Sequence, residues 1–363
     1  MRTILVINRS KTLMYIFVVN LLLLNSFFDY AYSAPNITNI SGDLKEGQVI
    51  SISGGGFGAN GPHILFYDNF EGGMIGQNIK TGPGSATIGQ WKSLNTVPPK
   101  YSADTSISGT NAFKVTGVQG VEAGTCGFIS LDNITEVFYS WWMYVPSSSP
   151  WSGEGPGSNP PNNINWKVMW MTQSSWSTDN DQDLVMIMNP SYWYISGNDA
   201  RWGTPDYFLM TINKGSWKRM WWWQKDGYNN DGSIKLWELL NTGVRLVQNV
   251  TGKTTLDYGA VRKLLSVNGY TRQHNSGTMP TQMFDDIYIA TGPNAQARVE
   301  IGTGCTGGDY TKCTNFAVST VNSWNDNLVT ATARLGNLSG TVNVFVIDAN
   351  GNVSNGITAI ISP

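Results

Sequence analysis

Residues 136–145 read Glu-Val-Phe-Tyr-Ser-Trp-Trp-Met-Tyr-Val, and the alternation within them decides the fold class. One face of such an extended segment carries apolar residues suited to a core, namely Val137, Tyr139, Trp141, Met143 and Val145. The other face is an aromatic set with little charge, made of Phe138, Ser140, Trp142 and Tyr144. A period of two residues is typical of β-structure, so the stretch predicts a strand with one core face and one aromatic face.

The same periodicity recurs along the chain, between clusters of turn residues. Runs with strand character are Trp166–Thr172, Leu184–Met188, Tyr207–Ile212, Trp217–Gln224, Ile234–Leu239 and Phe284–Ala290. Forty glycines and the near absence of helical spacing agree with this pattern. We therefore expect an all-β protein whose largest part is a two-sheet jelly roll.

Near the N-terminus, two short strand patterns run into Ser53-Gly54-Gly55-Gly56-Phe57-Gly58. Here the chain resembles the opening of an IPT/TIG immunoglobulin-like domain. The remaining strands of such a domain appear only at the other end of the chain, from Ala297 onward. We expect residues 34–61 and 297–363 to be the two halves of one smaller Ig-like β-sandwich.

Three segments of the intervening residues 62–296 carry a second resemblance. They are Phe66–Gly72, then Trp217-Lys218-Arg219 with Asp231-Gly232 and Leu236-Trp237, and finally Phe284–Tyr288. In these segments the chain is similar to the concanavalin A-like lectin/glucanase superfamily, which implies a jelly roll inserted into the Ig-like domain. That superfamily includes lectins, polysaccharide lyases and hydrolases, so the fold alone does not decide function.

Residues 1–33 have the features of a secretion signal. Basic residues precede the apolar stretch 13–24, and Ala31-Tyr32-Ser33 offers small residues for cleavage before Ala34. We expect a mature protein without a membrane span, secreted or held at the cell surface. Only 13% of residues are charged and the net charge is −2, so no basic stripe exists to bind nucleic-acid phosphates.

Fifteen tryptophans are more than a soluble core needs, and most lie between Trp141 and Trp237. Within Trp217–Lys225, one face of the expected strand combines indoles with cations. Indole has a flat apolar face and a polar N–H, which suits stacking on a pyranose ring. We expect a polysaccharide to bind in a groove on the concave face of the jelly roll, at Trp142, Tyr144, Lys167, Gln173, Arg219, Trp221 and Trp223.

The segment 268–274 offers groups for catalysis. If it is extended, Tyr270, Arg272 and His274 point the same way. A polysaccharide lyase needs a cation to neutralise a uronate carboxylate and a Tyr or His to remove the adjacent proton, so these three are the catalytic candidates.

Three classes of function stay open at this point. Non-catalytic carbohydrate binding is the leading interpretation, and a polysaccharide lyase is the alternative. A glycoside hydrolase is less favoured because the Glu-x-Asp-x-x-Glu pattern of jelly-roll glucanases is absent from the chain. A structural or adhesive surface protein would need no groove. The sequence identifies neither the glycan nor the oligomeric state.

Four carboxylates stand on segments that become the first and last strands of the jelly roll, which commonly pair. They are Asp68, Glu71, Asp285 and Asp286. Converging carboxylates suit a hard cation, so we expect them to hold a structural calcium ion, unless they cap loops and face water.

The chain has three cysteines. Cys305 and Cys313 bracket a Gly-rich loop, and an oxidising compartment predicts a disulfide between them. We expect Cys126 to be buried and inert.

Overall fold

The structure is a computed structural model that describes residues 34–118, 126–149, 165–173, 184–189, 192–197, 206–208, 213–272 and 280–363. By its contacts the chain divides into Met1–Ala34 and Pro35–Pro363, and every described strand lies in the second unit. The expected secretion signal, residues 1–33, lies outside the described residues. Among the described residues the regular structure is β-strand with two short 3₁₀ turns, which confirms the all-β class.

One sheet unites the two ends of the chain, and we call it the terminal module. Its strand order is β1-β2-β20-β19-β18-β21-β22. The strands are β1 (Asn36–Ser41), β2 (Val49–Gly55), β18 (Arg298–Thr303), β19 (Asn315–Trp324), β20 (Leu328–Thr332), β21 (Thr341–Ile347) and β22 (Ile357–Ile360), with 3₁₀ turns η2 (Thr306–Gly308) and η3 (Tyr310–Lys312) before β19. β2 pairs antiparallel with β20, with Ile52 opposite Val329.

A side chain from the C-terminal segment also holds the first strand. Asn355 Oδ1 accepts a hydrogen bond from the Ile37 N–H at 2.7 Å. The Asn355 amide donates to the Ile37 carbonyl at 3.0 Å. The side chain therefore imitates a paired backbone where β1 has no strand opposite Ile37 on that side. Both ends of the chain thus build one module, while its IPT/TIG resemblance stays a prediction.

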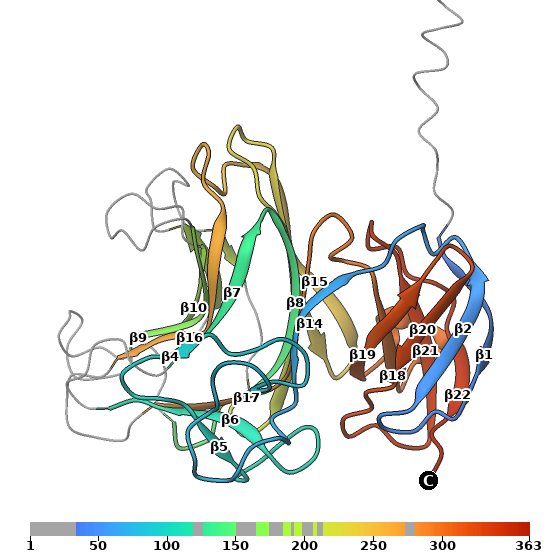
Figure 1. Cartoon of the computed structure of the whole chain (residues 1–363), viewed down its shortest axis with the longest axis horizontal. Coiled ribbons are helices and arrows are strands. Elements are labelled where there is room, and N and C mark those ends of the chain that lie inside the picture. The colour runs from blue at the N-terminus through green and yellow to red at the C-terminus, as the bar shows by residue number, and fades with distance from the viewer. Residues whose placement is uncertain are drawn as a thin grey trace, which may run out of the picture. The chain divides into compact units, whose positions relative to one another are not determined.

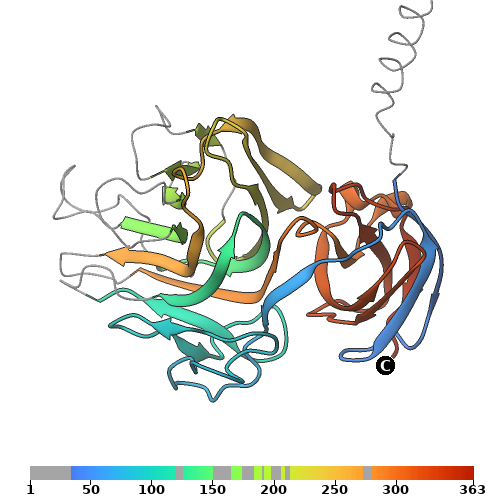
Figure 2. The same ribbon diagram turned by 45° about the horizontal axis from the view of Figure 1, so that its top comes forward.

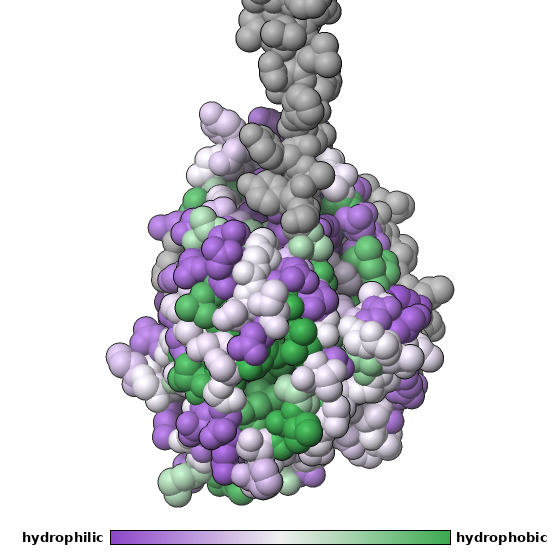
Figure 3. Space-filling view, turned by 90° about the vertical axis from the view of Figure 1, so that its right-hand side faces the viewer, coloured by the Kyte–Doolittle hydropathy of each residue, from purple (hydrophilic) through white to green (hydrophobic). Residues whose placement is uncertain are grey.

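The apolar core of the terminal module consists of aliphatic residues and Phe57. Its surface is partly apolar too, because Val49, Leu328 and Ile360 are exposed. Figure 3 shows apolar residues gathered on the face of this module that is turned toward the viewer.

Residues 63–291 form a two-sheet sandwich (Figure 1). We call its first sheet the medial sheet, with the order β15-β14-β13-β8-β17-β6-β5 and β3 paired to β17. Its strands are β3 (His63–Asp68), β5 (Lys100–Ser102), β6 (Ala112–Thr116), β8 (Glu136–Tyr144), β13 (Trp217–Lys225), β14 (Gly232–Leu240), β15 (Gly243–Lys253) and β17 (Thr281–Thr291).

We call the second sheet the lateral sheet, with the order β12-β11-β10-β9-β16-β7-β4. Its strands are β4 (Ser93–Leu94), β7 (Gly127–Ile134), β9 (Asn165–Thr172), β10 (Leu184–Asn189), β11 (Tyr192–Gly197), β12 (Asp206–Phe208) and β16 (Arg262–Arg272). In both ribbon views this sheet lies on the side of the sandwich away from the terminal module (Figures 1 and 2).

The main core fills the space between the medial and lateral sheets. It contains the whole predicted inner face of β8, from Val137 to Val145, together with Met220 and Trp222 of β13. Ile129, Met171 and Leu265 close it from the lateral sheet. The alternation expected for residues 136–145 is therefore confirmed.

The second apolar face of β8 and β13 is also covered. A separate cluster joins Phe138, Trp142 and Trp221 of the medial sheet to Phe316 and Phe345 of the terminal module. A strand with two apolar faces is typical of the middle layer of three, and the medial sheet is that layer.

Candidate functional site

The groove expected on β8 and β13 is replaced by a contact between two parts of the chain. Trp142, Trp221 and Trp223 are only 5%, 1% and 8% exposed, and Arg219 is 0% exposed. The expectation that these four side chains contact a ligand is therefore wrong for this structure, since strands β19 and β21 occupy the surface beside them.

The Trp221 indole shows how specific this contact is. Its Nε1–H donates to Glu300 Oε1 at 2.6 Å, and its ring meets the Phe316 ring edge-on at 5.7 Å. Glu300 also accepts a hydrogen bond from the Tyr310 hydroxyl at 2.6 Å and forms an ion pair with Arg298 at 3.2 Å. The indole N–H that was expected to bind a sugar is satisfied by a buried carboxylate of the terminal module.

Arg219 is likewise part of the interior. Its guanidinium carbon lies 5.6 Å from the Trp142 ring centre and 5.4 Å from the Trp221 ring centre. Its Nη2 donates to Ser140 Oγ at 3.0 Å. Burial lowers the pKa of Arg219. The two indole faces lie beside the cation, an arrangement that is stronger when water is excluded, and the charges of Glu300 and Asp286 also favour the charged form of Arg219.

Two further binding candidates have structural contacts. Gln173 is 3% exposed, and its side-chain amide exchanges two hydrogen bonds with Asp257, at 2.7 Å to Oδ2 and at 3.1 Å from the backbone N–H. Tyr144 is half-buried, with its ring 5.5 Å from the Trp217 ring. Gln173 is therefore a brace for the segment around residue 257, while Tyr144 keeps a partly open face.

Three of the remaining candidates, Lys167, Tyr270 and Arg272, lie on two paired strands of the lateral sheet. β16 pairs antiparallel with β9, and Tyr270 stands directly opposite Lys167, with Arg272 opposite Asn165. The backbone therefore brings together two residues that the sequence selected from distant segments. The side chains of Lys167, Tyr270 and Arg272, and the whole of His274, lie outside the described residues.

A bulge sets this register. The pairing of β16 with β9 shifts between Val267 and Tyr270, and Asn268 has a left-handed φ of 55°. Asn-Gly sequences favour this conformation, so Asn268-Gly269, which reads as a turn, is accommodated as an extra residue within the strand. The bulge therefore sets which residues of β9 stand opposite Tyr270 and Arg272.

The opposite end of β16 is fixed by a buried ion pair. Arg262 Nη2 lies 3.0 Å from Asp226 Oδ1, and both side chains are within 1% of complete burial. Because Asp226 follows β13 of the medial sheet, the pair ties the two sheets together. Neither residue could be selected from the sequence, since a single Arg and a single Asp far apart have no recognisable spacing.

A row of side chains on the lateral sheet that sequence reasoning missed runs across three strands. Ser266 of β16 stands opposite Phe128 of β7 on one side and Trp170 of β9 on the other. Phe128 and Trp170 are half-buried, and their neighbours Ile129, Met169 and Met171 belong to the main core. Strand alternation therefore puts the two rings on the face opposite the core. In the sequence, Trp170 within the predicted strand 166–172 was the residue that could have indicated this row.

The four carboxylates expected to hold calcium are brought near one another, because β3 pairs with β17 as predicted, with Asp68 opposite Ile287. Among the described residues, however, no group of three or more acidic, His or Cys side chains is arranged to hold a metal. Protein donors bond their oxygens instead.

Asp68 accepts from Trp91 Nε1 at 2.8 Å and from the Phe70 N–H at 3.0 Å. Glu71 accepts from the Thr110 and Asn111 N–H groups at 2.9 and 2.7 Å.

Asp285 and Asp286 share a serine. Asp285 Oδ2 accepts the Ile107 and Ser108 N–H groups at 2.9 and 3.2 Å. Ser108 Oγ donates to Asp286 Oδ1 at 2.9 Å, which also accepts from the Tyr67 hydroxyl at 3.2 Å. These contacts argue that the carboxylates organise the long segment 69–111, and they argue against calcium.

Burial controls the protonation of these acids. It raises the pKa of Asp68 to about 7, despite the hydrogen bonds from Trp91 and Phe70 that favour the charged form. Burial also raises the pKa of Asp285, as does the neighbouring charge of Asp286. The pKa of Asp286 is raised by burial too, against the opposing attraction of Arg219.

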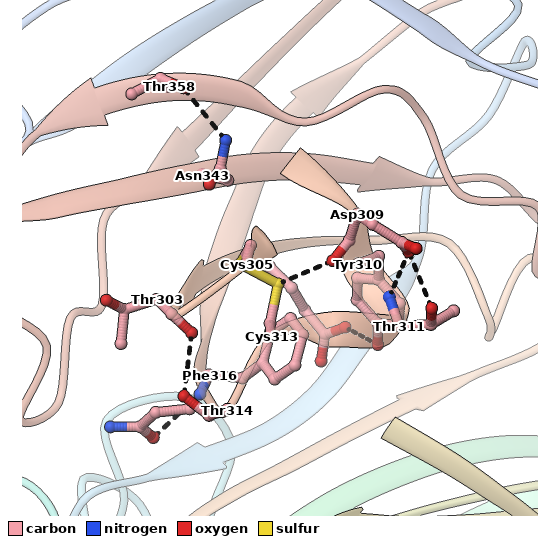
Figure 4. The surroundings of a disulfide bond; sticks show 12 residues. Thr303, Cys305, Asp309, Tyr310, Thr311, Cys313, Thr314, Phe316, Asn343 and Thr358 are labelled. Atoms are coloured by element: carbon pink, nitrogen blue, oxygen red, sulfur yellow. Dashed lines mark hydrogen bonds between the residues drawn. A yellow bond between two sulfur atoms is a disulfide. The ribbon is translucent and has the colours of Figure 1, made fainter. Parts of the chain in front are cut away.

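The disulfide between Cys305 and Cys313 is confirmed. The loop that it closes carries Tyr310, whose ring lies 4.8 Å from the Phe316 ring (Figure 4). Cys126 is free and buried, as expected. Burial raises the pKa of its thiol to about 11, which keeps the sulfur protonated and unreactive.

Within the described residues, no helix has the length and apolar character needed to cross a bilayer. No family model matches the chain, and no curated protein matches it.

Several solved structures are similar in fold. They include the endo-β-1,4-glucuronan lyase of the fungus Trichoderma reesei, with 13% identity, 60% of this chain and 96% of the lyase covered, and a TM-score of 0.43. The alginate lyase Aly36B shares 14% identity over 63% of this chain and 97% of its own, with a TM-score of 0.45. The GH131 β-glucanase catalytic domain of Podospora anserina shares 10% identity over 63% of this chain and 96% of its own, with a TM-score of 0.38. At these values the likeness assigns neither a family nor an activity to this chain.

Proposed function

We propose that this protein acts outside the cell on uronate-containing polysaccharide, which it binds and cleaves by β-elimination on the lateral sheet. The observation that carries the proposal is the register of β16 with β9, which sets Tyr270 opposite Lys167. Residues directly opposed on antiparallel strands share one face of the sheet, with Cβ atoms about 5 Å apart. A phenol and an ammonium at that spacing can both reach one sugar ring.

The roles follow from the chemistry of elimination. A cation, Lys167 or Arg272, neutralises the uronate carboxylate and so stabilises the negative charge that develops when the adjacent C–H loses its proton. Tyr270 takes that proton, and the C–H electrons form a carbon–carbon double bond. The glycosidic C–O bond breaks, and its oxygen leaves with a proton supplied by the same phenol or by water.

A second candidate function is recognition without cleavage. It is favoured by Phe128 and Trp170, whose half-buried rings flank Ser266 on the face opposite the core. Flat apolar rings of this kind suit the C–H faces of sugars. The disulfide between Cys305 and Cys313 fits an extracellular setting for either function.

The test uses the full chain with alginate, glucuronan and a neutral β-glucan. We expect product with the ultraviolet absorbance of a conjugated double bond from an acidic polymer and none from the neutral one. Tyr270→Phe should abolish the product. Tyr258→Phe should not, because this tyrosine is 89% exposed and lies in the loop before β16, at the Arg262 end of the strand and not at the Tyr270 end.

Equal activity of Tyr270→Phe and the parent chain would rule out the assigned role. Binding without product, lost in Trp170→Ala, would select recognition over cleavage. Neither binding nor product would contradict both candidates and favour a structural role.

A further inference from the structure

A cleft beside β5 of the medial sheet, where the segment 76–79 hydrogen-bonds to that strand, has no part in the proposed site. It has a volume of about 420 Å³ and is lined by β5, β6 and the segments around Ile75 and Pro98. Ligand sites in proteins measure roughly 300–1,000 Å³, so the cleft can hold a sugar-sized group. β5 is the last strand of the medial sheet, far in strand order from the lateral-sheet register of Tyr270 and Lys167.

Two lysines face each other in this cleft. Lys100 of β5 stands directly opposite Lys114 of β6, and both side chains line the cavity. Like charges in this relation repel and destabilise the strand pair. Lys114 forms an ion pair with Asp104, whereas no described carboxylate lies within ion-pair distance of Lys100. The cleft therefore keeps one uncompensated positive charge.

One wall of the cleft is held in place from both ends. Asp104 contacts Lys114, and the next residue, Thr105, accepts a hydrogen bond from Trp217 Nε1 at 3.1 Å. The hydrogen bond from the Lys114 ammonium lowers the pKa of Asp104, so this carboxylate stays charged and pairs with Lys114. The Lys100 ammonium is left to meet a ligand.

Aliphatic residues line much of the rest of the cleft, together with Ser102 and Thr116. Ile75 is 60% exposed and Val118 is 39% exposed, and Val97 and Pro98 join them. Single exposed aliphatic residues are ordinary, but here they gather around two cations in one hollow. Such a site fits a ligand with a C–H face and a negative charge on the same ring.

We infer that this cleft is a second carbohydrate site, which binds a uronate unit of an acidic polysaccharide away from the lateral sheet. The carboxylate lies between the Lys100 and Lys114 ammonium groups and relieves their repulsion. The ring rests on Ile75 and Val118. The inference rests on the proposed substrate class, but it requires no catalysis.

The experiment measures retention of the full chain in gels that contain alginate, glucuronan or neutral β-glucan, at low and at moderate salt. Lys100→Ala/Lys114→Ala should weaken retention by the acidic polymer about tenfold or more, since each lost charge-assisted contact contributes about that factor. Retention should fall with added salt. Lys45→Ala/Lys312→Ala removes two exposed lysines of the terminal module and should match the parent chain.

Two further variants separate this site from the proposed catalytic one and from misfolding. Lys100→Arg should keep most of the retention, and Lys100→Ala should not lower the melting temperature because it removes a repulsive pair. Tyr270→Phe should lose product formation yet stay retained by the acidic polymer. Retention of Lys100→Ala/Lys114→Ala equal to its lysine control, or no retention of the parent chain by acidic polymer, would overturn the inference. The first result leaves the proposed function intact, provided that the parent chain still forms product.

Discussion

The bond between Trp221 and Glu300 should measure how strongly the terminal module is attached to the sandwich. Trp221→Phe removes the Nε1–H donor and leaves Glu300 Oε1, in a side chain that is 0% exposed, without that partner. A hydrogen bond to a charged group contributes about 1.5–3 kcal/mol, and a buried acceptor cannot turn to water instead. We expect a loss of that size, in addition to the cost of the smaller ring.

The neighbouring residue supplies a matched control. Trp222 is also fully buried, but it points into the main core, where its Nε1–H has no hydrogen-bond partner among the described atoms. Trp222→Phe removes the same atoms without breaking a hydrogen bond. The difference between the two variants therefore isolates the bond to Glu300, because the costs of lost volume nearly cancel.

Urea unfolding, followed by circular dichroism and by fluorescence, gives the free energy of each variant. Trp221→Phe should be less stable than Trp222→Phe by about 1.5–3 kcal/mol. A cycle with Tyr310→Phe should show coupling, since both donors bond the same carboxylate. Equal losses in the two variants, or separate unfolding of the terminal module in the parent chain, would refute the reasoning.

Three other predictions concern stability. Burial raises the pKa of Asp68 in the folded state to about 7, above its unfolded value, so between about pH 4 and 7 the folded state binds a proton that the unfolded state does not. The free energy of unfolding should therefore fall as the pH rises through that window. Asp68→Asn should make this fall smaller in urea titrations. Cys305→Ser/Cys313→Ser opens a loop with a sequence separation of 8 and should cost about 2–3 kcal/mol, measured against the parent chain with and without reductant. Calcium and chelator should give the same melting temperature, because protein donors already bond the four carboxylates; a rise with calcium would revive the metal site.

The strands and their two faces could be predicted because a period of two residues follows from the backbone alone. The alternation in residues 136–145 assigned Tyr139 and Trp141 to the core, and they are there. What covers the second face could not be predicted in the same way. An indole beside an arginine looks alike in sequence whether it meets a sugar or a phenylalanine from another module.

A signal for the internal contact did exist in β18. Arg298 and Glu300 alternate within an otherwise apolar strand, and charged residues at such positions need buried partners. For the four carboxylates, the pairing of β3 with β17 was predicted. Their hydrogen-bond donors could not be predicted, because Trp91 and Ser108 lie in an irregular segment without periodicity. The register of Tyr270 with Lys167 depended on a bulge at Asn268, which no alternation rule locates.

The hydrogen bonds between Asn355 and Ile37 have a consequence for folding during synthesis. A ribosome makes Ile37 318 residues before Asn355, so the terminal module lacks this contact while the intervening residues are synthesised. The nested sandwich is free to assemble in that interval, and a chain cut short before Asn355 would leave β1 without its clasp. Synthesis of Asn355 thus completes the hydrogen bonds that join the two halves of the terminal module at Ile37.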